Sequence, residues 1–236
     1  MTLSDFVPAA NQGADPELYE VENRALDPEG TLWHQLQNTA PWKGKTLLDL
    51  GCGSGYWLPK YRSARRVIGV EPDESLLPMA RRRPGEAEVL HGSAEHLPLG
   101  DNTVDVVHAR FAYFFPSRSF DPTPGLREVQ RVLSPGGKLV VIDNDGLNGE
   151  FAELLQASAS AQAQGHDDYS TRWWSSQGAS TTAVMSSWRF SSREDLEAVL
   201  GLEFGRDAEA WLSAHPHSLG LSYGYLLHTW TNPQQV

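Results

Sequence analysis

Residues 46–55, with the sequence TLLDLGCGSG, constrain the fold of this chain more than any other stretch. Leu47, Leu48 and Leu50 form an apolar run interrupted only by Asp49, which predicts a short buried strand of a parallel sheet. Three alternating glycines follow, and glycine is needed where the backbone turns with positive φ or a ligand packs against the main chain. The chain then becomes compatible with a helix. We therefore expect a strand, a bare loop and a helix N-terminus at the sheet edge where α/β proteins bind nucleotides.

The rest of the chain alternates strand and helix patterns. Strands are predicted over 67–71, 87–91, 104–109, 138–143, 182–190 and 219–229, and helices over 16–27, 31–38, 56–63, 72–83, 125–133, 150–163, from 191 onward and over 207–214. Strands that alternate with helices at this spacing predict an α/β fold with a doubly wound parallel sheet. Residues 164–180 are interpreted as a loop.

The length of 236 residues favours one domain. We expect two N-terminal helices within 1–45, a cofactor-binding core over 46–145, a variable cover segment over 146–181, and the final strands and helices over 182–236. The N-terminal helices could lie over the first strand as a lid or merely plug the sheet edge. The cover segment could equally be a simple insertion.

Composition excludes several classes of function. The net charge of −11 argues against a nucleic-acid substrate, because phosphate binding needs a basic surface. A single cysteine, Cys52, excludes an internal disulfide and fits a reducing compartment. No apolar stretch approaches the length of a membrane span, and the first residues lack the pattern of a secretion signal. We therefore expect a cytoplasmic protein that binds neither nucleic acid nor membrane.

The spacing of the glycines narrows the ligand. Tyr56 stands where a dinucleotide fingerprint would place its last glycine, which counts against NAD. Glu71, at the end of the second predicted strand, could accept hydrogen bonds from both hydroxyls of a ribose. No lysine or arginine lies between Asp49 and Tyr56 to meet a phosphate. Asp49 instead places a negative charge beside the loop, which favours a cationic ligand.

Four motifs resemble the class I S-adenosylmethionine-dependent methyltransferases of the small-molecule type. They are LLDLGCGSG, VIGVEPDESLLPMAR, GSAEHLPLGDNTVDVVHARFAYF and LREVQRVLSPGGKLVVID, and they cover about residues 46–145 in the family's order. The tail over roughly 182–230 is similar to the closing two strands of that fold. The resemblance implies a Rossmann-like seven-stranded sheet, mostly parallel with the last strand antiparallel, and helices on both faces. It also implies S-adenosylmethionine as cofactor.

The resemblance implies a set of cofactor-binding residues in these motifs and in the first helix. They are Tyr19, Arg24, Asp49, Gly51, Gly53, Gly55, Glu71, Pro72, Asp73, Ser93, Ala94, Glu95 and Ala109. The glycines would approach the methionine part, Glu71 would hold the ribose, and residues 93–95 would edge the adenine. Many relatives carry aspartate where Ser93 stands, so that contact is weaker here. Tyr19 and Arg24 would close on the methionine carboxylate, although Arg24 could equally be a surface residue.

Catalysis and the acceptor are less defined. Methyl transfer in a single displacement requires mostly alignment and exclusion of water, and a base only if the acceptor must lose a proton. Asp145 and His108 are the candidates for that base, although the position of His108 inside a strand favours a buried, hydrogen-bonded histidine over a catalytic one. Arg110 stands where metal-dependent relatives carry an acid, so we expect no metal ion. Aromatic residues that could wall the acceptor pocket or simply pack are Tyr113, Phe114, Phe115, Trp173, Trp174 and Trp188.

We therefore expect a methyltransferase acting on an O, N or C atom of a small molecule. A binding module for S-adenosylmethionine that has lost the chemistry is the alternative. An NAD-dependent oxidoreductase is a third reading, weakened by Tyr56. The acceptor and the oligomeric state do not follow from the sequence.

Overall fold

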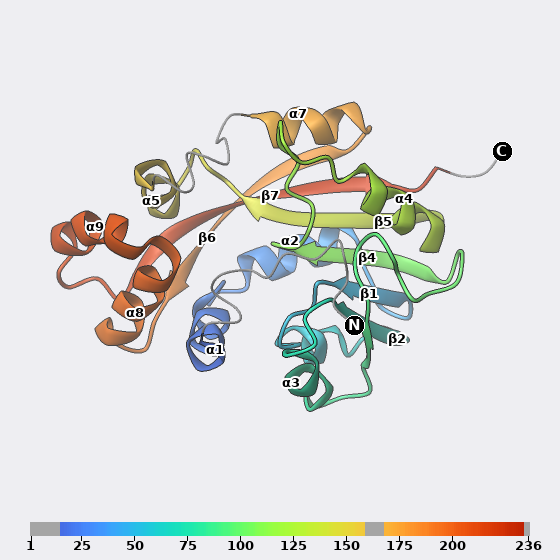
Figure 1. Cartoon of the computed structure of the whole chain (residues 1–236), viewed down its shortest axis with the longest axis horizontal. Coiled ribbons are helices and arrows are strands. Elements are labelled where there is room, and N and C mark those ends of the chain that lie inside the picture. Colours follow the sequence, from blue (N-terminus) through green and yellow to red (C-terminus); the bar gives the residue numbers. More distant parts are fainter. Residues whose placement is uncertain (1–14, 159–167, 234–236) are drawn as a thin grey trace.

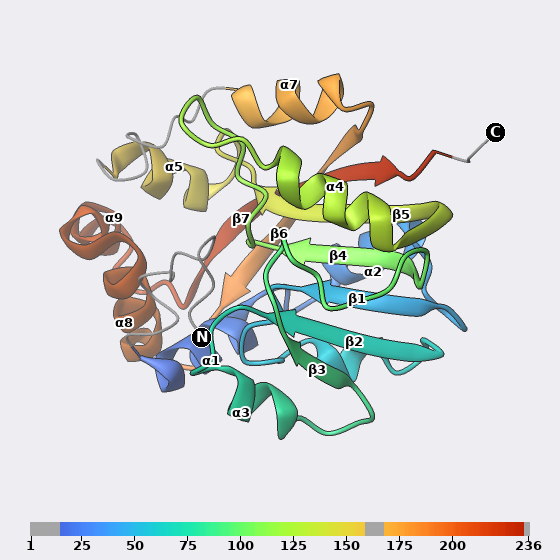
Figure 2. The ribbon, with the colours of Figure 1, turned by 45° about the vertical axis from the view of Figure 1, so that its right-hand side comes forward.

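The computed structural model describes residues 15–158 and 168–233, which form a sheet of order β3-β2-β1-β4-β5-β7-β6. The ribbon in Figure 2 shows the strands lying side by side in this order. Their bounds are β1 (Thr46–Leu50), β2 (Arg66–Glu71), β3 (Glu88–His91), β4 (Val104–Arg110), β5 (Leu133–Asn144), β6 (Ser180–Arg189) and β7 (Gly220–Thr231). Strands β1 to β5 pair in parallel, and β7 runs antiparallel to both β5 and β6. This confirms the predicted Rossmann-like sheet, mostly parallel with its last strand reversed.

Helices cover both faces of the sheet (Figure 1). Their bounds are α1 (Pro16–Ala25), α2 (Thr31–Thr39), α3 (Leu77–Arg81), α4 (Thr123–Val132), α5 (Glu150–Ala157), α7 (Tyr169–Ser176), α8 (Arg193–Phe204) and α9 (Glu209–Ala214), with 3₁₀ turns η1 (Leu58–Tyr61) and η2 (Gly205–Ala208). Leu47 of β1 packs in the cluster that contains residues of α2, α5 and α8, whereas Leu48 packs in the cluster that contains residues of α4 and α7. Because both faces are buried, apolar residues stand at successive positions of the central strands, as at Leu47 and Leu48.

The prediction of a helix over 56–63 is wrong. The chain forms only the 3₁₀ turn η1, with hydrogen bonds from Leu58 N to Gly55 O and from Lys60 N to Trp57 O. Pro59 has no amide hydrogen to donate to Gly55, which removes a bond that an α-helix would need. The helix expected over 72–83 is likewise confined to α3, which begins just before Pro78.

The cover segment also differs from expectation. The helix predicted over 150–163 ends at Ala157, and its last five residues lie outside the described part. The predicted loop that follows contains α7. Trp174 of α7 is fully buried against Phe114 and His228, so burial of this indole under the sheet determines the helix.

The turn between α1 and α2 is attached to β6. Asp27 accepts hydrogen bonds from the first amides of α2, at Leu32 and Trp33. It also accepts from the Ser186 hydroxyl at 2.6 Å, and its own amide donates to Ser187 O. The two N-terminal helices are therefore anchored to the far edge of the sheet, and α1 reaches back over the glycine loop.

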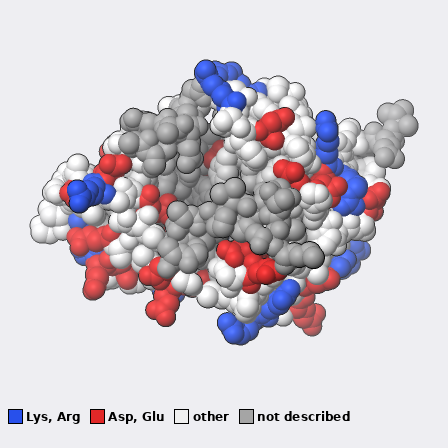
Figure 3. Space-filling model, in the orientation of Figure 1, with Lys and Arg blue, Asp and Glu red and all other residues white. Residues whose placement is uncertain are grey.

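The surface agrees with the charge of the sequence. On the face in Figure 3, lysine and arginine side chains lie in small separate groups, while carboxylates gather over the region of α1 and α8. Within the described residues, none of the helices is long and apolar enough to cross a bilayer.

Candidate functional site

The loop after β1 is made of three left-handed glycines. Gly51, Gly53 and Gly55 have φ angles of 71°, 55° and 74°. A Cβ on Gly51 would lie 2.4 Å from Ala112 Cβ, one on Gly53 would lie 2.8 Å from the Tyr19 hydroxyl, and one on Gly55 would lie 2.9 Å from the backbone of α3. Both the backbone conformation and the space therefore require glycine here.

Glu71, at the end of β2, holds the loop from the neighbouring strand. Its two carboxylate oxygens accept from Gly53 N at 2.7 Å and from Asp73 N at 2.9 Å. Burial raises the pKa of this carboxyl to about 7, although the two amide donors work against the rise. Each oxygen keeps a further lone pair. Glu71 can therefore orient the loop and still accept from a ligand.

A three-residue clasp joins α1, the loop and the segment after α3. Glu20 accepts from the Ser54 hydroxyl at 2.6 Å and from Arg83 at 2.5 Å. Arg83 also donates to the Ser54 carbonyl oxygen at 2.9 Å. Ser54 is almost fully buried under this clasp. Helix α1 is therefore fixed to the loop by charge-assisted hydrogen bonds rather than by apolar contact alone.

The buried face of α1 carries Tyr19 and Asn23, one turn apart. The Asn23 side-chain amide donates to Tyr19 O at 2.9 Å, and its oxygen accepts from Arg110, the last residue of β4, at 2.9 Å. The Arg110 guanidinium lies 4.7 Å from the centre of the Trp57 ring. Arg24, in contrast, is exposed on α1. The structure thus brings Tyr19 to the loop, but not Arg24.

Asp49 differs from Glu71 because none of the described residues donates a hydrogen bond to its carboxylate. It is only 4% exposed, yet its carboxylate takes part in none of the hydrogen bonds or ion pairs of the described residues. Burial raises its pKa to about 7, and the nearby Arg110 charge moderates the rise. A buried carboxyl without a donor is costly, so this position suits a ligand that brings a positive charge.

The residues expected around the adenine lie at the ends of β2 and β3. Ser93 is buried and its hydroxyl has no hydrogen-bond partner. Glu95 accepts from the Tyr113 hydroxyl at 2.8 Å. Asp73 accepts from Ser75 N, and the Pro72 carbonyl oxygen lies 3.1 Å from the His91 ring. Ala94 is buried at the same edge, and Ala109 is fully buried at the end of β4.

The two candidate bases have different surroundings. Asp145 is buried, and its two oxygens accept from Leu147 N at 2.9 Å and from the Asn148 side chain at 2.8 Å. His108 is fully buried within β4, 3.3 Å from the Tyr61 hydroxyl and edge-on to Trp42. Burial lowers the pKa of His108 to about 3. This imidazole is therefore neutral and a weak proton acceptor at neutral pH.

The aromatic residues after β4 differ in how far they are exposed. Phe114 is fully buried in the core, whereas Phe115 is 43% exposed. Phe111 and Tyr113 have positive φ angles of 48° and 57°, which non-glycine residues adopt rarely. The Phe111 ring faces Tyr225 at 6.1 Å.

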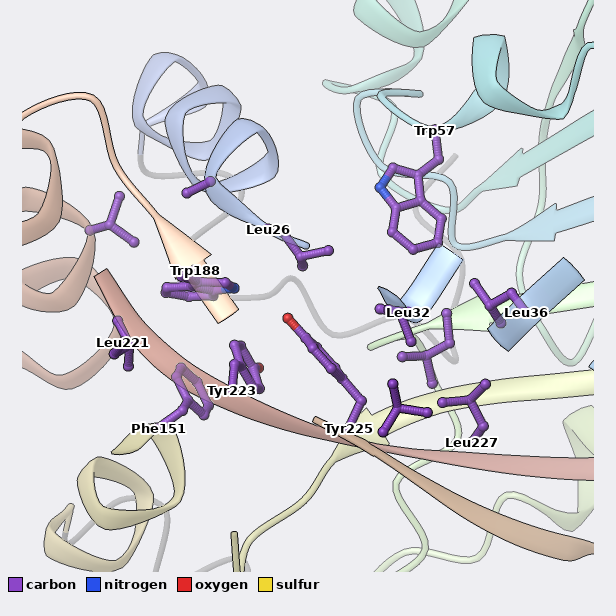
Figure 4. Packing of buried hydrophobic residues seen from close by; sticks show 14 of the residues in the cluster. Leu26, Leu32, Leu36, Trp57, Phe151, Trp188, Leu221, Tyr223, Tyr225 and Leu227 are labelled. Carbon is purple, nitrogen blue, oxygen red and sulfur yellow. The ribbon is translucent and has the colours of Figure 1, made fainter. Parts of the chain in front are cut away.

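Phe111 extends a stack that rises from β7. Phe151 stacks on Tyr223 at 3.8 Å, and Tyr223 on Tyr225 at 4.3 Å. Trp188 of β6 meets Tyr223 edge-on at 5.1 Å. Figure 4 shows Tyr225 pointing away from β7, with its hydroxyl directed to the side on which Leu26 and Trp57 lie. Phe111, Tyr225, Tyr223 and Phe151 thus form an aromatic wall that begins next to Arg110 in β4 and continues into the core.

Sequence reasoning missed Arg110, Glu22 and Tyr225. Glu22 of α1 has one buried oxygen without a partner, and burial together with Glu203 raises its pKa to about 8. Arg110 could have been found from its place, since it is two residues beyond the partner of Asp49 in β4 and so shares its face. Glu22 and Tyr225 carry no local signal, because only the packing of α1 and β7 places them here.

A family model described as a methyltransferase domain matches residues 48–141. An uncharacterized methyltransferase of Mycobacterium tuberculosis is 31% identical over 145 residues, which are 61% of this chain and 56% of that protein. The malonyl-[acyl-carrier protein] O-methyltransferase of Yersinia pestis is 32% identical over 124 residues, covering 52% of this chain and 45% of that protein. The chain thus spans about half the length of the curated relatives it matches.

Solved structures extend the likeness to most of the chain. A putative methyltransferase of Haloferax volcanii, solved in complex with a Trm112 methyltransferase activator, superposes with a TM-score of 0.59 at 21% identity. That match covers 97% of this chain and all of that one. A SAM-dependent methyltransferase of Aquifex aeolicus matches with a TM-score of 0.57 at 18% identity, over 91% of this chain and 97% of that one. At these identities the likeness shows the fold.

Proposed function

We propose that this chain is a class I S-adenosylmethionine-dependent methyltransferase that transfers a methyl group from S-adenosylmethionine to an O, N or C atom of a small molecule. The observation that carries the proposal is the edge formed by β1 and β2. There, a glycine cradle that no side chain could replace lies beside two buried carboxylates, Asp49 and Glu71.

The residues present fit the cofactor by their chemistry. Ser93 offers a buried hydroxyl without a partner on the side expected for adenine. Glu71 has lone pairs left for two ribose hydroxyls. Asp49 is a buried acceptor without a donor, which a cation would satisfy. When bound, S-adenosylmethionine supplies a methyl group on a positively charged sulfur.

This chain's own residues then have to align the reactants and exclude water. Helix α1, fixed by the clasp of Glu20, Ser54 and Arg83, covers the loop. Phe111 at the end of β4 begins the aromatic wall on the acceptor side.

Removal of a proton from the acceptor, where needed, was expected to involve Asp145 or His108. Both oxygens of Asp145 already accept hydrogen bonds, and His108 is neutral and fully buried. We therefore propose that neither position supplies a base and that the acceptor displaces the methyl group directly from the sulfur.

The acceptor that we propose is a small molecule. The relatives are named for different acceptors. One is a malonyl-[acyl-carrier protein] O-methyltransferase, and another, from Listeria welshimeri, is a demethylmenaquinone methyltransferase. The acidic surface and the separate groups of basic residues favour a small molecule over a nucleic acid.

Two measurements test the proposal. Calorimetry with S-adenosylmethionine should give a Kd between about 1 µM and about 1 mM, the usual range for enzyme substrates. A panel of phenols, amines, carboxylic acids and quinols should then reveal release of S-adenosylhomocysteine with at least one member. Absence of cofactor binding by the folded wild-type protein would overturn the proposal.

A further inference from the structure

Two buried hydrogen-bond donors lie in the aromatic wall and beside it. Tyr225 of β7 is fully buried and Trp188 of β6 is 2% exposed, yet within the described part of the chain the hydroxyl of one and the indole nitrogen of the other have no hydrogen-bond partner. Trp188 is close enough to the Tyr225 oxygen to lower its pKa, but no described group accepts the Tyr225 proton. Figure 4 shows both polar atoms turned to the side on which Leu26 lies. A buried donor without an acceptor is costly, so both are available to a ligand that brings acceptors.

The strand register places a charged donor beside them. Arg110, the last residue of β4, is in register with Ile142 of β5, and Ile142 is in register with Leu227 of β7. Tyr225 lies two residues from Leu227, so it projects from the same face of the sheet, closer to the carboxyl end of β5. Burial raises the pKa of Tyr225 and the Arg110 charge works against that rise, which indicates that the two groups lie close together.

Arg110 has donors left for a ligand. Its guanidinium lies 4.7 Å from the centre of the Trp57 ring and donates one hydrogen bond to the neutral Asn23 side chain. It takes part in none of the ion pairs within residues 15–158 and 168–233. A guanidinium offers five donors in a rigid fork that matches a carboxylate. An anionic oxygen group therefore fits this position.

Two carboxyl groups near these donors do not oppose an anion. Besides burial, Asp27 and Glu22 both raise the pKa of Tyr225, so both lie near its hydroxyl. Asp27 already accepts from two amides of α2 and from the Ser186 hydroxyl. Glu22 has one buried oxygen without a partner, and burial together with Glu203 raises its pKa to about 8. Glu22 is therefore mostly protonated at neutral pH, and a protonated carboxyl is a further donor.

These donors lie on the acceptor side of the site. The cofactor edge that we propose is formed by β1 and β2, whereas β4 and β5 separate β1 from β7 in the sheet. Neighbouring strands are about 4.8 Å apart, so Tyr225 lies about 14 Å across the sheet from β1. The Tyr225 ring faces Phe111 at 6.1 Å, where the aromatic wall begins. A ligand that meets Tyr225 and Trp188 is therefore the acceptor rather than the cofactor.

We propose that the acceptor is a carboxylic acid, that Arg110, Tyr225 and Trp188 bind its carboxylate, and that one carboxylate oxygen takes the methyl group. This inference rests on the proposed function and narrows its acceptor. A carboxylate is ionised at neutral pH, so no base is needed. Its oxygen forms a bond to the methyl carbon while the carbon–sulfur bond breaks, and the electron pair of that bond stays on sulfur. The products are a methyl ester and S-adenosylhomocysteine, and no proton moves.

The test measures ester formation from matched acceptors. Wild-type protein and S-adenosylmethionine labelled in its methyl group are incubated with benzoate, phenylacetate or octanoate, and in parallel with the corresponding primary amides and amines. A methyl ester releases labelled methanol on mild alkaline treatment, whereas an N-methyl product does not. We expect methanol from at least one acid and no methylated product from the amides or amines.

The outcomes separate this inference from the function on which it rests. Protein that binds S-adenosylmethionine but gives no methanol from any acid, or that methylates an amine, would overturn the carboxylate acceptor and leave the proposed function standing. Folded protein that does not bind S-adenosylmethionine in calorimetry would overturn the proposed function itself.

Variants then test which residues bind the carboxylate. Tyr225→Phe and Arg110→Gln should each raise KM for the active acid at least about tenfold and leave the Kd of S-adenosylmethionine within about threefold of wild type. Trp188→Phe should raise KM by a smaller factor, since it removes one neutral donor. A loss of cofactor affinity in Arg110→Gln with KM for the acid unchanged would overturn the assignment of Arg110.

Trp211→Phe is the matched control for Trp188→Phe. Its indole nitrogen is also buried and has no partner among the described residues, but it belongs to α9. We expect this variant to turn over the active acid like wild type. An equal rise of KM in Trp188→Phe and Trp211→Phe would mean that loss of packing, and not loss of the donor, weakens binding. If Arg110→Gln does not fold, Arg110→Lys keeps the charge without the planar fork and should still raise KM.

Discussion

Carboxylates at the two halves of one sheet edge have different hydrogen-bond partners. On the β1–β2 side, Glu71 accepts only from backbone amides, and Asp49 accepts from none of the described residues. On the β5 side, Asp143 accepts from Asn144 N and from Ser170 of α7, while Asp145 fixes the turn that follows. The first pair keeps lone pairs free for the ligand that we propose, whereas the second pair fixes the turn after β5 and contacts α7. Carboxylates at one sheet edge therefore differ in whether the fold already uses their hydrogen-bonding capacity.

The largest effect is expected at the glycine loop. Gly51→Ala places a methyl group 2.4 Å from Ala112 Cβ and forces a side chain into positive φ, so we expect cofactor affinity to fall about a hundredfold or more in calorimetry. Gly44→Ala is the matched control, because Gly44 also has positive φ but has nothing within 4 Å of the added atom. Equal losses in the two variants would mean that backbone strain, rather than the cradle, controls binding.

The next effect contrasts the two carboxylate pairs directly. Glu71→Ala removes an acceptor for the ribose and the anchor of Gly53 N, so we expect affinity to fall about tenfold or more. Asp143→Ala, at the other half of the edge, should change affinity by less than about twofold while lowering the melting temperature. A similar loss of affinity in both variants would remove the distinction between the halves.

A smaller effect should follow pH. The pKa of Asp49 and that of Glu71 are both raised to about 7 by burial, so the folded protein without ligand binds protons that the unfolded chain releases near pH 4. Stability of the free protein should therefore fall as pH rises from about 5 to about 8. A bound cation favours the ionised carboxylates, so cofactor affinity should rise over pH 6 to 8.

Two measurements check this dependence. Thermal melts at several pH values, with and without saturating S-adenosylmethionine, should show a shallower decline in the presence of the cofactor. Asp49→Asn should flatten the pH dependence of affinity, since the amide cannot ionise. An affinity that does not change between pH 6 and 8 would contradict the assignment of these carboxyls to the cation.

The sequence allowed the sheet and the glycine loop after β1 to be predicted because both depend on local pattern. Leu47 to Leu50 and the three glycines specify the strand and the loop within nine consecutive residues. The parts that were wrong depend on single residues or on distant packing. Pro59 reduces the expected helix to η1, and burial of Trp174 forms α7 where a loop was expected.

The same reasoning explains the site residues that were missed. Arg110 and Glu22 act through contacts between β4 and α1, which are 87 residues apart for Arg110 and Asn23. No spacing rule brings such residues together. Once the strand register is known, Arg110 can be placed on the same face of the sheet as Asp49. Glu22 can be placed only once the packing of α1 against α8 is known.

The smallest effect on cofactor binding is expected at Asp145. Variants of this residue distinguish a catalytic role from a structural one. Asp145→Ala leaves Leu147 N and the Asn148 amide without an acceptor, so we expect a loss of about 1 to 3 kcal/mol in unfolding free energy and cofactor affinity within about twofold of wild type. Asp145→Asn keeps an oxygen for Leu147 N and should recover most of that stability. If Asp145 instead accepts a proton from the acceptor, Asp145→Asn will melt like wild type and still lose methyl transfer, because an amide cannot act as a base. If turnover falls in parallel with the melting temperature in both variants, Asp145 has a structural role, as Asp143 does.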